Sequence, residues 1–209
     1  MLTIVTAATD RSLLTIEELR SAAGVTDTSE DAALTALGGY ISALIAAACN
    51  VEAAGTTPPT LRLETVRQTY RHTQSDTPTI VTLSRSPVVS VTSVTVNDTV
   101  LDAANYELDG QRLHRLSGNY IRRWEAGEVV ADYSAGWATV PDDLKYAAIK
   151  FVQAERAIGG RDPYLKARTI PGVLEQQWWV DPNRSSSIPP DVYNILCLGG
   201  YTREWGWLS

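Results

Sequence analysis

The sequence predicts an α+β protein: a small helical bundle with an inserted antiparallel β-hairpin/sheet unit and an extended C-terminal tail. Three observations carry this prediction. Apolar residues recur at helical spacing before residue 52 and again after Pro141. Between these helices, residues 61–134 combine strand-like alternation with turn dipeptides, which indicates paired strands. From residue 160 onward prolines interrupt the chain, and a short helix is the main regular element indicated there.

We therefore expect two parts, divided after residue 159. Residues 1–159 form one domain, with helices at about 15–24, 30–52 and 141–158 and a β unit at about 61–134. Residues 160–209 form the tail, with a short helix at about 190–198. One domain with an appendage suits a chain of 209 residues, since domains usually span ~100–200 residues.

The charge balance bears on the kind of partner. The net charge is −6, and the chain contains few lysines. Affinity for phosphate comes from lysine and arginine, so we expect a poor sequence-independent nucleic-acid binder. Such a chain could still surround DNA without holding it, because like charges repel.

Membrane and redox signals are weak. The longest apolar run, Tyr40–Cys49, is far short of the ~20 residues that a membrane span needs, and the N-terminus lacks the pattern of a secretion signal. Cys49 and Cys197 lie far apart in the sequence. We expect two reduced thiols, with a disulfide between them as the alternative.

The N-terminal helices have clear start and packing signals. Thr15 and Glu18 form a capping box, and Gly24 ends the first helix. The second helix carries an apolar seam, and its other faces hold small residues that allow close approach of another helix or a neighbouring subunit. The predicted subunit-packing positions are Ala36, Gly39, Ala43 and Ala47. The alternative is an alanine-rich core helix buried within the monomer.

The β unit contains a phase change and two turns. Valines at 89 and 91 fall on one face of a strand and those at 94 and 96 on the other, which indicates a β-bulge near Thr92–Ser93 or a strand buried on both sides. Asn97-Asp98 and Asp109-Gly110 are typical of hairpin turns.

A basic cluster follows the second turn. Arg115, Arg122 and Arg123 lie near Trp124, and Arg112 precedes them. These arginines could contact nucleic acid. An adjacent tryptophan and hairpin favour a protein–protein edge or a set of ion pairs, so we predict a ring or tail-side contact here.

The segment 128–156 contains a strand, a turn and a helix. Residues 128–133 alternate, Gly136 permits the reversal, and Pro141 suits the first helical position. Asp142 and Asp143 then place negative charge at the positive end of the helix dipole. This segment is a packing unit without an evident catalyst.

The tail concentrates aromatic residues. Each such ring can bury ~150–250 Å², so we expect them to dock on a partner, on a neighbouring copy, or on the body of the same subunit. The predicted docking residues are Trp178, Trp179, Val192, Ile195, Leu196, Tyr201, Trp205 and Trp207.

Signals for catalysis are absent from the sequence patterns. His72 and His114 have no ligand-spaced partners, and no nucleophile elbow, zinc-protease or phosphate-loop motif occurs. Paired acids such as Glu17-Glu18 and Glu30-Asp31 lie at helix starts, where the dipole explains them. We expect no enzyme activity, no cofactor and no metal.

The order of several motifs resembles a known family. S-P-V-V-S-V-T-S-V at 86–94 precedes N-Y-E-L-D-G at 105–110, V-V-A-D-Y-S-A-G-W at 129–137 and V-P-D-D-L-K-Y-A-A-I at 140–149, with I-P-P-D-V-Y-N-I-L at 188–196. This series is similar to the head–tail connector (adaptor) family of tailed bacteriophages and phage-like particles. The resemblance covers about 15–157, with a weaker match at 188–203, and the tryptophan-rich stretch 160–187 departs from it.

The resemblance implies a structural role in the virion neck, after assembly in the host bacterial cytoplasm. Members form a ring, commonly dodecameric, between the portal protein ring and the stopper or tail-completion protein. DNA passes through without sequence-specific binding, and no membrane is involved. From the residues we add two hypotheses: the tail binds the portal, and the acidic segment 1–55 faces the channel through Glu17, Glu18, Glu30 and Asp31.

Other functions remain open at this stage. A stopper or tail-completion protein would be another ring of the same neck. In a different class, a carbohydrate- or peptide-binding β-module would use exposed tryptophans on the β region. An enzyme is the third alternative.

Overall fold

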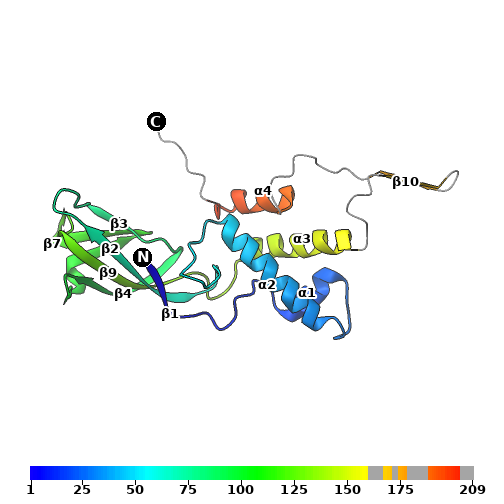
Figure 1. Ribbon diagram of the computed structural model, residues 1–209, viewed down its shortest axis with the longest axis horizontal. Coiled ribbons are helices and arrows are strands. Elements are labelled where there is room, and N and C mark those ends of the chain that lie inside the picture. The colour runs from blue at the N-terminus through cyan, green and yellow to red at the C-terminus, as the bar shows by residue number, and fades with distance from the viewer. Residues whose placement is uncertain (160–166, 171–173, 178–187, 203–209) are drawn as a thin grey trace. The chain divides into compact units, whose positions relative to one another are not determined.

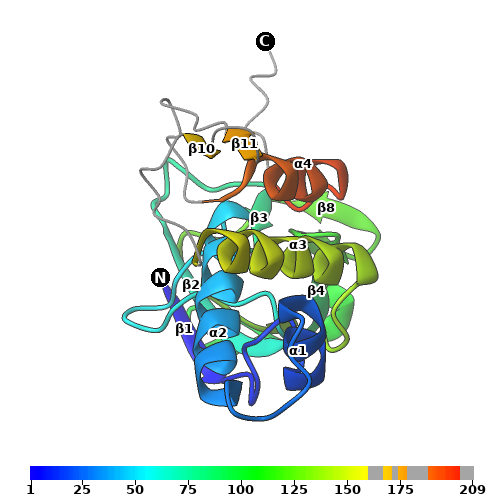
Figure 2. The same ribbon diagram turned by 90° about the vertical axis from the view of Figure 1, so that its right-hand side faces the viewer.

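The chain folds as two compact units. The computed structural model describes residues 1–159, 167–170, 174–177 and 188–202. The β unit comprises residues 1–13 and 46–141, and the helical unit comprises residues 14–45 together with the described residues from Asp142 onward. Figures 1 and 2 show the elements of each. The mixed α+β class predicted from the sequence is confirmed.

The β unit contains two antiparallel sheets. In the larger sheet the strand order is β1-β2-β9-β4-β5, and in the smaller sheet it is β3-β7-β6, with β8 also paired to β7. The larger sheet consists of β1 (Leu2–Thr6), β2 (Glu64–His72), β4 (Val88–Val96), β5 (Thr99–Val100) and β9 (Gly127–Ala135). The smaller consists of β3 (Ile80–Thr82), β6 (Tyr106–Asp109), β7 (Arg112–Ser117) and β8 (Tyr120–Arg122), with a short 3-10 helix, η1 (Ala103–Asn105), before β6.

Alternating side chains form the core of the β unit. Along β9, Val129, Ala131 and Tyr133 are buried while their neighbours are more exposed, as the sequence pattern predicted. The ring of Trp124 is buried in the same core, and its Nε1–H donates to the carbonyl of Leu113 at 3.3 Å. This core joins residues from both sheets.

The predicted bulge and turns are confirmed. The register between β4 and β9 shifts between Val91 and Ser93, which is where the valine phase changes. Asn97 and Asp98 have φ angles of 47° and 63° and join β4 to β5. Gly110, with φ 59°, joins β6 to β7.

The helical unit contains α1 (Ile16–Ala23), most of α2 (Asp31–Ala48), α3 (Asp142–Gly159) and α4 (Pro190–Leu198). A strand pair, β10 (Ala167–Ile170) and β11 (Leu174–Gln177), lies between α3 and α4 in sequence. Within this unit α3 lies between α1 and α4 (Figure 2). The capping box of Thr15 and Glu18 and the left-handed Gly24 are confirmed at the two ends of α1.

The helix expected over 30–52 ends earlier. Asn50 adopts a left-handed conformation with φ 53°, and its N–H donates to the carbonyl of Ala47 at 3.0 Å. Asparagine tolerates this conformation, so it can close a helix as glycine does. The last helical residue is therefore Ala48.

Candidate protein-interaction surfaces

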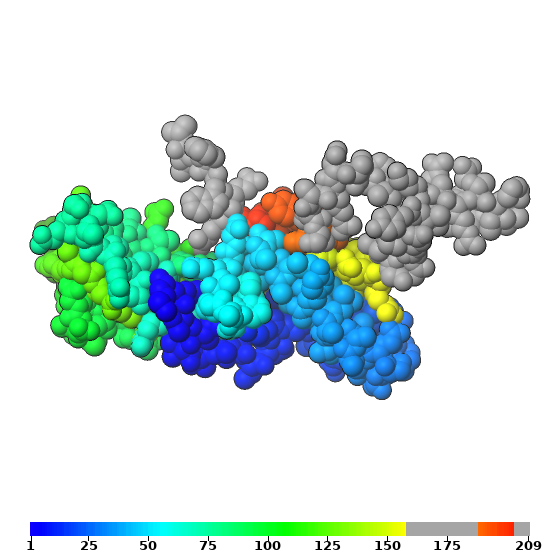
Figure 3. Space-filling view, viewed as in Figure 1, coloured from blue at the N-terminus to red at the C-terminus, as the bar shows by residue number. Residues whose placement is uncertain are grey.

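The first candidate surface is the outer face of α2. Ala36, Gly39 and Ala47 are exposed and Ala43 is half-buried, whereas Leu34, Ile41 and Ile45 on the opposite side are buried. Among the described residues, α2 therefore buries one side in the core and exposes the other. We name the exposed set, together with Tyr40, which is 55% exposed, the α2 face. Figure 3 shows part of α2 (blue) at the molecular surface.

The composition of α2 would also suit a membrane. By length and hydropathy alone, residues Asp31–Ala48 could cross one, and 33% of that window is buried in the protein. Amphipathic packing accounts for the buried side, and the small side chains on the other side leave room for a second protein surface. Such helices occur in the cores of soluble proteins, so we do not infer a membrane span.

One glycine of α2 lies inside the helical unit instead. A Cβ added to Gly38 would lie 2.8 Å from Cδ1 of Leu19, so this glycine permits α1 to approach α2 closely. By contrast, a Cβ added to Gly39 would meet no atom within 4 Å. The two neighbouring glycines thus have different roles, and only Gly39 belongs to the α2 face.

The predicted channel-facing acids are largely paired within the helical unit. The Nζ of Lys145 lies 2.7 Å from Glu18, Nη1 of Arg156 lies 2.7 Å from Glu30, and Nε of Arg20 donates to Asp31 at 2.7 Å. Hydrogen bonding from Arg20 holds the pKa of Asp31 below its usual value. In the described part of the chain, Glu17 is exposed and forms no salt bridge. Three of the four acids predicted to face the channel are therefore paired with cations of the same unit.

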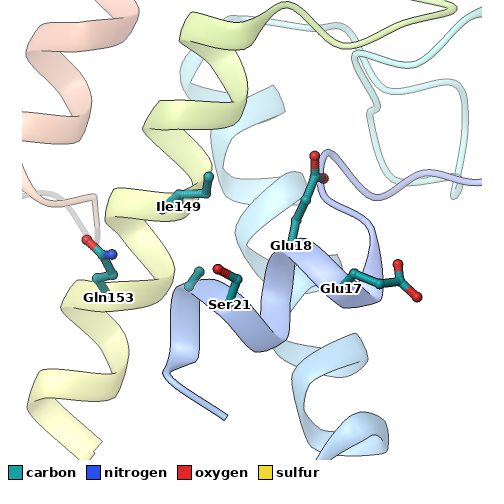
Figure 4. Close-up of a pocket in the computed structure, with 6 residues that line it drawn as sticks. Glu17, Glu18, Ser21, Ile149 and Gln153 are labelled. Atoms are coloured by element: carbon teal, nitrogen blue, oxygen red, sulfur yellow. The ribbon is translucent and has the colours of Figure 1, made fainter. Parts of the chain in front are cut away.

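A shallow groove runs between α1 and α3 (Figure 4). Its volume is about 320 Å³, and Glu18, Ser21, Ile149 and Gln153 are among the residues that line it. Ile149 and Ala22 supply an apolar floor, while the carboxylate of Glu18 is already paired with Lys145.

The short helix α4 packs within its own unit. Val192 and Leu196 are fully buried and Ile195 is half-buried, so the first two are not available to a portal protein. The hydroxyl of Tyr201 donates to Asp143 at 2.7 Å and ties the end of α4 to the start of α3. The tryptophans predicted to dock, at positions 178, 179, 205 and 207, lie outside the described residues.

The basic cluster is only partly at the surface. Trp124 is 1% exposed and Arg115 is 8% exposed, so neither can form the predicted ring or tail-side contact. Arg122 and Arg123 are exposed: the first pairs with Glu125, and the second donates to the carbonyl of Thr77 at 2.8 Å. The burial of Trp124 could not be predicted from its neighbours, because the two arginines directly before it suggested an exposed ring.

Sequence reasoning missed a buried ion pair in the β unit. Glu64 and Arg85 have side-chain exposures of 2% and 5%, and their nearest charged atoms lie 3.6 Å apart. Arg11 adds a second positive charge, 3.0 Å from Glu64, and Arg85 donates to the carbonyl of Thr60 at 3.0 Å. Burial lowers the pKa of Arg85 while Glu64 opposes that shift.

Hydrogen bonds extend this cluster to the neighbouring strand. The hydroxyl of Tyr133 donates to Gln68 at 2.7 Å and accepts from the backbone N–H of Arg85 at 3.2 Å. Burial raises the pKa of Tyr133 to about 12. We name residues 11, 64, 68, 85 and 133 the polar cluster. Among the described residues, no group of three or more His, Cys, Asp or Glu side chains could hold a metal.

Comparison with protein families gives the context of these surfaces. A model of the head completion protein family matches residues 12–155. The chain belongs to the head completion protein family. No curated protein matches it.

Two solved structures share the fold of this head completion protein. One is a chain from the neck of an empty gene transfer agent particle, with a TM-score of 0.55, 22% identity and coverage of 76% of this chain and 84% of that chain. The other, from the virion of a native gene transfer agent particle, has a TM-score of 0.55, 23% identity and the same two coverages.

Family membership and burial argue against two of the alternative functions, an enzyme and a carbohydrate- or peptide-binding module. A head completion protein is a structural part of a virion and not an enzyme, in agreement with the predicted non-catalytic role. The carbohydrate- or peptide-binding module required exposed tryptophans on the β region. Trp124 is buried there, and Trp137 is half-buried with its backbone paired to that of Arg62. Neither tryptophan of the β region is therefore exposed enough to stack on a sugar or a peptide as such a module requires.

Proposed function

We propose that this head completion protein is the head–tail adaptor of a phage or phage-like particle. It forms a ring, commonly dodecameric, in the neck between the portal protein and the stopper or tail. DNA passes through the ring without sequence-specific binding, and the ring assembles in the cytoplasm of the host bacterium.

The family match over residues 12–155 carries this proposal. The likeness in fold to a chain from the neck of a gene transfer agent particle supports the same position. The motif order at 86–94, 105–110 and 140–149, which resembles that of adaptors, favours an adaptor over a stopper.

Self-association through the α2 face fits a ring. Ala36, Gly39 and Ala47 expose little side chain, so the backbone of a neighbouring subunit can approach closely. Exposed Tyr40 offers an aromatic anchor, a residue type that often carries interface energy. A contact of this kind needs no ordering of long, flexible side chains, which lowers its entropic cost.

The charge distribution fits a passage that does not grip DNA. Residues 14–45 contain five acidic residues and a single basic one, Arg20, which is paired with Asp31. Such a surface offers few cations to phosphate, so DNA should slide past it. Glu17 and Asp27 are the exposed acids of this segment, and of these only Glu17 is among the four predicted channel-facing residues; the acids in ion pairs contribute less to the negative field.

We also propose that the tryptophans of the tail dock on the portal protein. Deleting residues 160–209 would test this poorly, because that deletion also removes α4 and its buried Val192 and Leu196. Replacement of Trp178 and Trp179, or of Trp205 and Trp207, by serine leaves α4 in place. We expect portal binding to weaken while the unfolding midpoint stays unchanged.

Native mass spectrometry of the chain with and without the portal protein tests the function. An adaptor should bind portal in multiple copies, whereas a stopper should bind only a preformed adaptor ring. Ala36→Gln, on the α2 face, should abolish the multi-copy complex, and Ala157→Gln, at an exposed position on α3, should not. Absence of any portal complex for the unmodified chain would overturn the adaptor assignment.

A further inference from the structure

The β7–β8 hairpin presents an unusual exposed tip. Residues 118–121, which we name the hairpin tip, are all exposed, with Tyr120 at 81% and Ile121 at 59%. Large apolar side chains at the end of a hairpin cost free energy in water at ~25 cal/mol per Å². Adjacent exposed residues of this size indicate a contact surface more strongly than scattered single ones do.

The tip also has an open strand edge and a neighbouring hollow. Among the described residues, β8 pairs only with β7, so the outer backbone groups of Tyr120–Arg122 are available to a partner. Beside it lies a groove of about 530 Å³, bounded by Ala103, Tyr106, Leu116 and Ile121. A protruding aromatic next to a groove can interlock with another protein.

The charges around the tip are positive, yet they do not suit DNA. Residues 110–125 contain four arginines and one acid, Glu125. Arg115 is buried and Arg122 pairs with Glu125, which leaves Arg112 and Arg123 as exposed cations that form no salt bridge among the described residues, too few for strong binding to phosphates. The residual positive field and the apolar tip together suit an acidic protein surface.

We propose that the hairpin tip is a subunit interface, covered by the acidic helical segment 14–45 of a second copy of this chain. This inference rests on the proposed ring. In a ring each subunit uses two different surfaces, because the contacts are head-to-tail. The α2 face supplies small residues within an acidic segment; the hairpin tip supplies bulky apolar residues within a basic one.

A second copy fits better than another class of partner because the two segments complement each other in charge. Residues 14–45 contain five acids against Arg20, and Lys145 and Arg156 pair with two of these acids, so this surface keeps an excess of two negative charges. Residues 110–125 contain four arginines against one acid. Tyrosine and arginine are also the residue types that dominate binding energy at interfaces. The complementary surface is therefore present in the chain itself.

Site-specific photo-crosslinking tests this arrangement. Benzoylphenylalanine replaces Tyr120 in the full chain, and complexes with the portal protein are assembled from equal amounts of ¹⁴N- and ¹⁵N-labelled subunits. After illumination, mass spectrometry identifies the crosslinked peptides. We expect mixed-isotope peptides that join residue 120 of one copy to residues 14–45 of another. The matched control places the probe at Val100, which is 67% exposed in the same unit, and should give no such product.

The outcomes separate the two proposals. Crosslinks to the portal or to a tail protein, absence of any crosslink in an assembled ring, or equal yield from position 100 would each overturn the hairpin interface while leaving the adaptor function intact. Failure of the unmodified chain to assemble with portal would instead overturn the adaptor function. As a second readout, Tyr120→Ser with Ile121→Thr should weaken ring assembly at least tenfold without lowering the unfolding midpoint, and Val100→Thr should leave assembly unchanged.

Discussion

Removal of Glu64 should destabilise the β unit more than removal of either arginine beside it. Glu64 is the shared counter-charge of Arg85, which is 5% exposed, and of Arg11, which is 34% exposed. Glu64→Leu leaves the charge of Arg85 buried without compensation, for which about 3–5 kcal/mol is typical. Since a protein of this size loses about 2–4 °C per kcal/mol, the midpoint of thermal unfolding should fall by about 6–20 °C.

The two arginine variants set the scale. Arg85→Met should cost less, about 1–3 kcal/mol, because Glu64 keeps Arg11 and accepts the backbone N–H of Ala8 at 3.3 Å. Arg11→Met should cost about 1 kcal/mol or less, because that guanidinium is partly in water. The double variant Glu64→Leu with Arg85→Met should be more stable than Glu64→Leu alone, since apolar pairs often replace buried ion pairs without loss.

Amide hydrogen exchange in urea is a suitable assay because it follows the stability of each compact unit through its own amides. Amides of β2 and β9, which carry Glu64, Gln68 and Tyr133, report on the β unit, and amides of α3 serve as an internal reference. If Arg85→Met proves as costly as Glu64→Leu, or the double variant is the least stable of the set, then Glu64 is not the shared counter-charge.

Three further predictions follow from single contacts. Tyr133→Phe should lower the free energy of unfolding by about 1–2 kcal/mol at neutral pH and make the alkaline loss of stability shallower. Burial raises the pKa of Tyr133 to about 12 in the folded state against ~10 in the unfolded state, so the stability that depends on its neutral hydroxyl is present below pH 10 and is lost as the pH approaches 12. Unfolding measured between pH 8 and 11 checks this prediction, and an unchanged pH slope in the variant would contradict it. Gly136→Ala should lower the free energy of unfolding, measured by urea titration, by at least about 1–3 kcal/mol. The φ angle of Gly136 is 104°, and a new Cβ would collide with the backbone carbonyl oxygen of Arg62. A neutral effect would mean that the turn can rearrange. Gly39→Ala should raise the free energy of unfolding by up to about 1 kcal/mol through helix propensity, whereas Gly38→Ala should lower it because the new Cβ forces Leu19 to move. Calorimetry of the two variants compares these effects, and equal effects would refute the assignment of the two glycines to different surfaces.

Local signals predicted the local structure well. The Thr15–Glu18 capping box, the Asp109-Gly110 turn and the valine phase change each specify a backbone geometry through nearby residues, and each is present. The end of α2 was misplaced because Asn50 stops it through a left-handed conformation that the residue type permits without requiring.

The candidate interfaces were harder to predict because burial depends on distant residues. Nothing near Trp124 in the sequence reveals that its indole meets the carbonyl of Leu113 in the core. Likewise Glu18 and Lys145 are separated by 127 residues, so the neutralisation of this acid became evident only in the folded chain. The buried pairing of Glu64 with Arg85 was missed for the same reason.

The hydrogen bond between Tyr201 and Asp143 limits how far the C-terminal indoles can extend. At no more than ~3.6 Å per residue, Trp205 can lie at most about 11 Å from Thr202, and Trp207 about 18 Å. A binding pocket for these rings must therefore lie within that distance of Thr202, plus the length of the tryptophan side chain. Inserting a glycine- and serine-rich linker after Thr202 would extend the reach of these tryptophans. If distance alone restricts docking, the lengthened chain should bind a wider range of portal proteins.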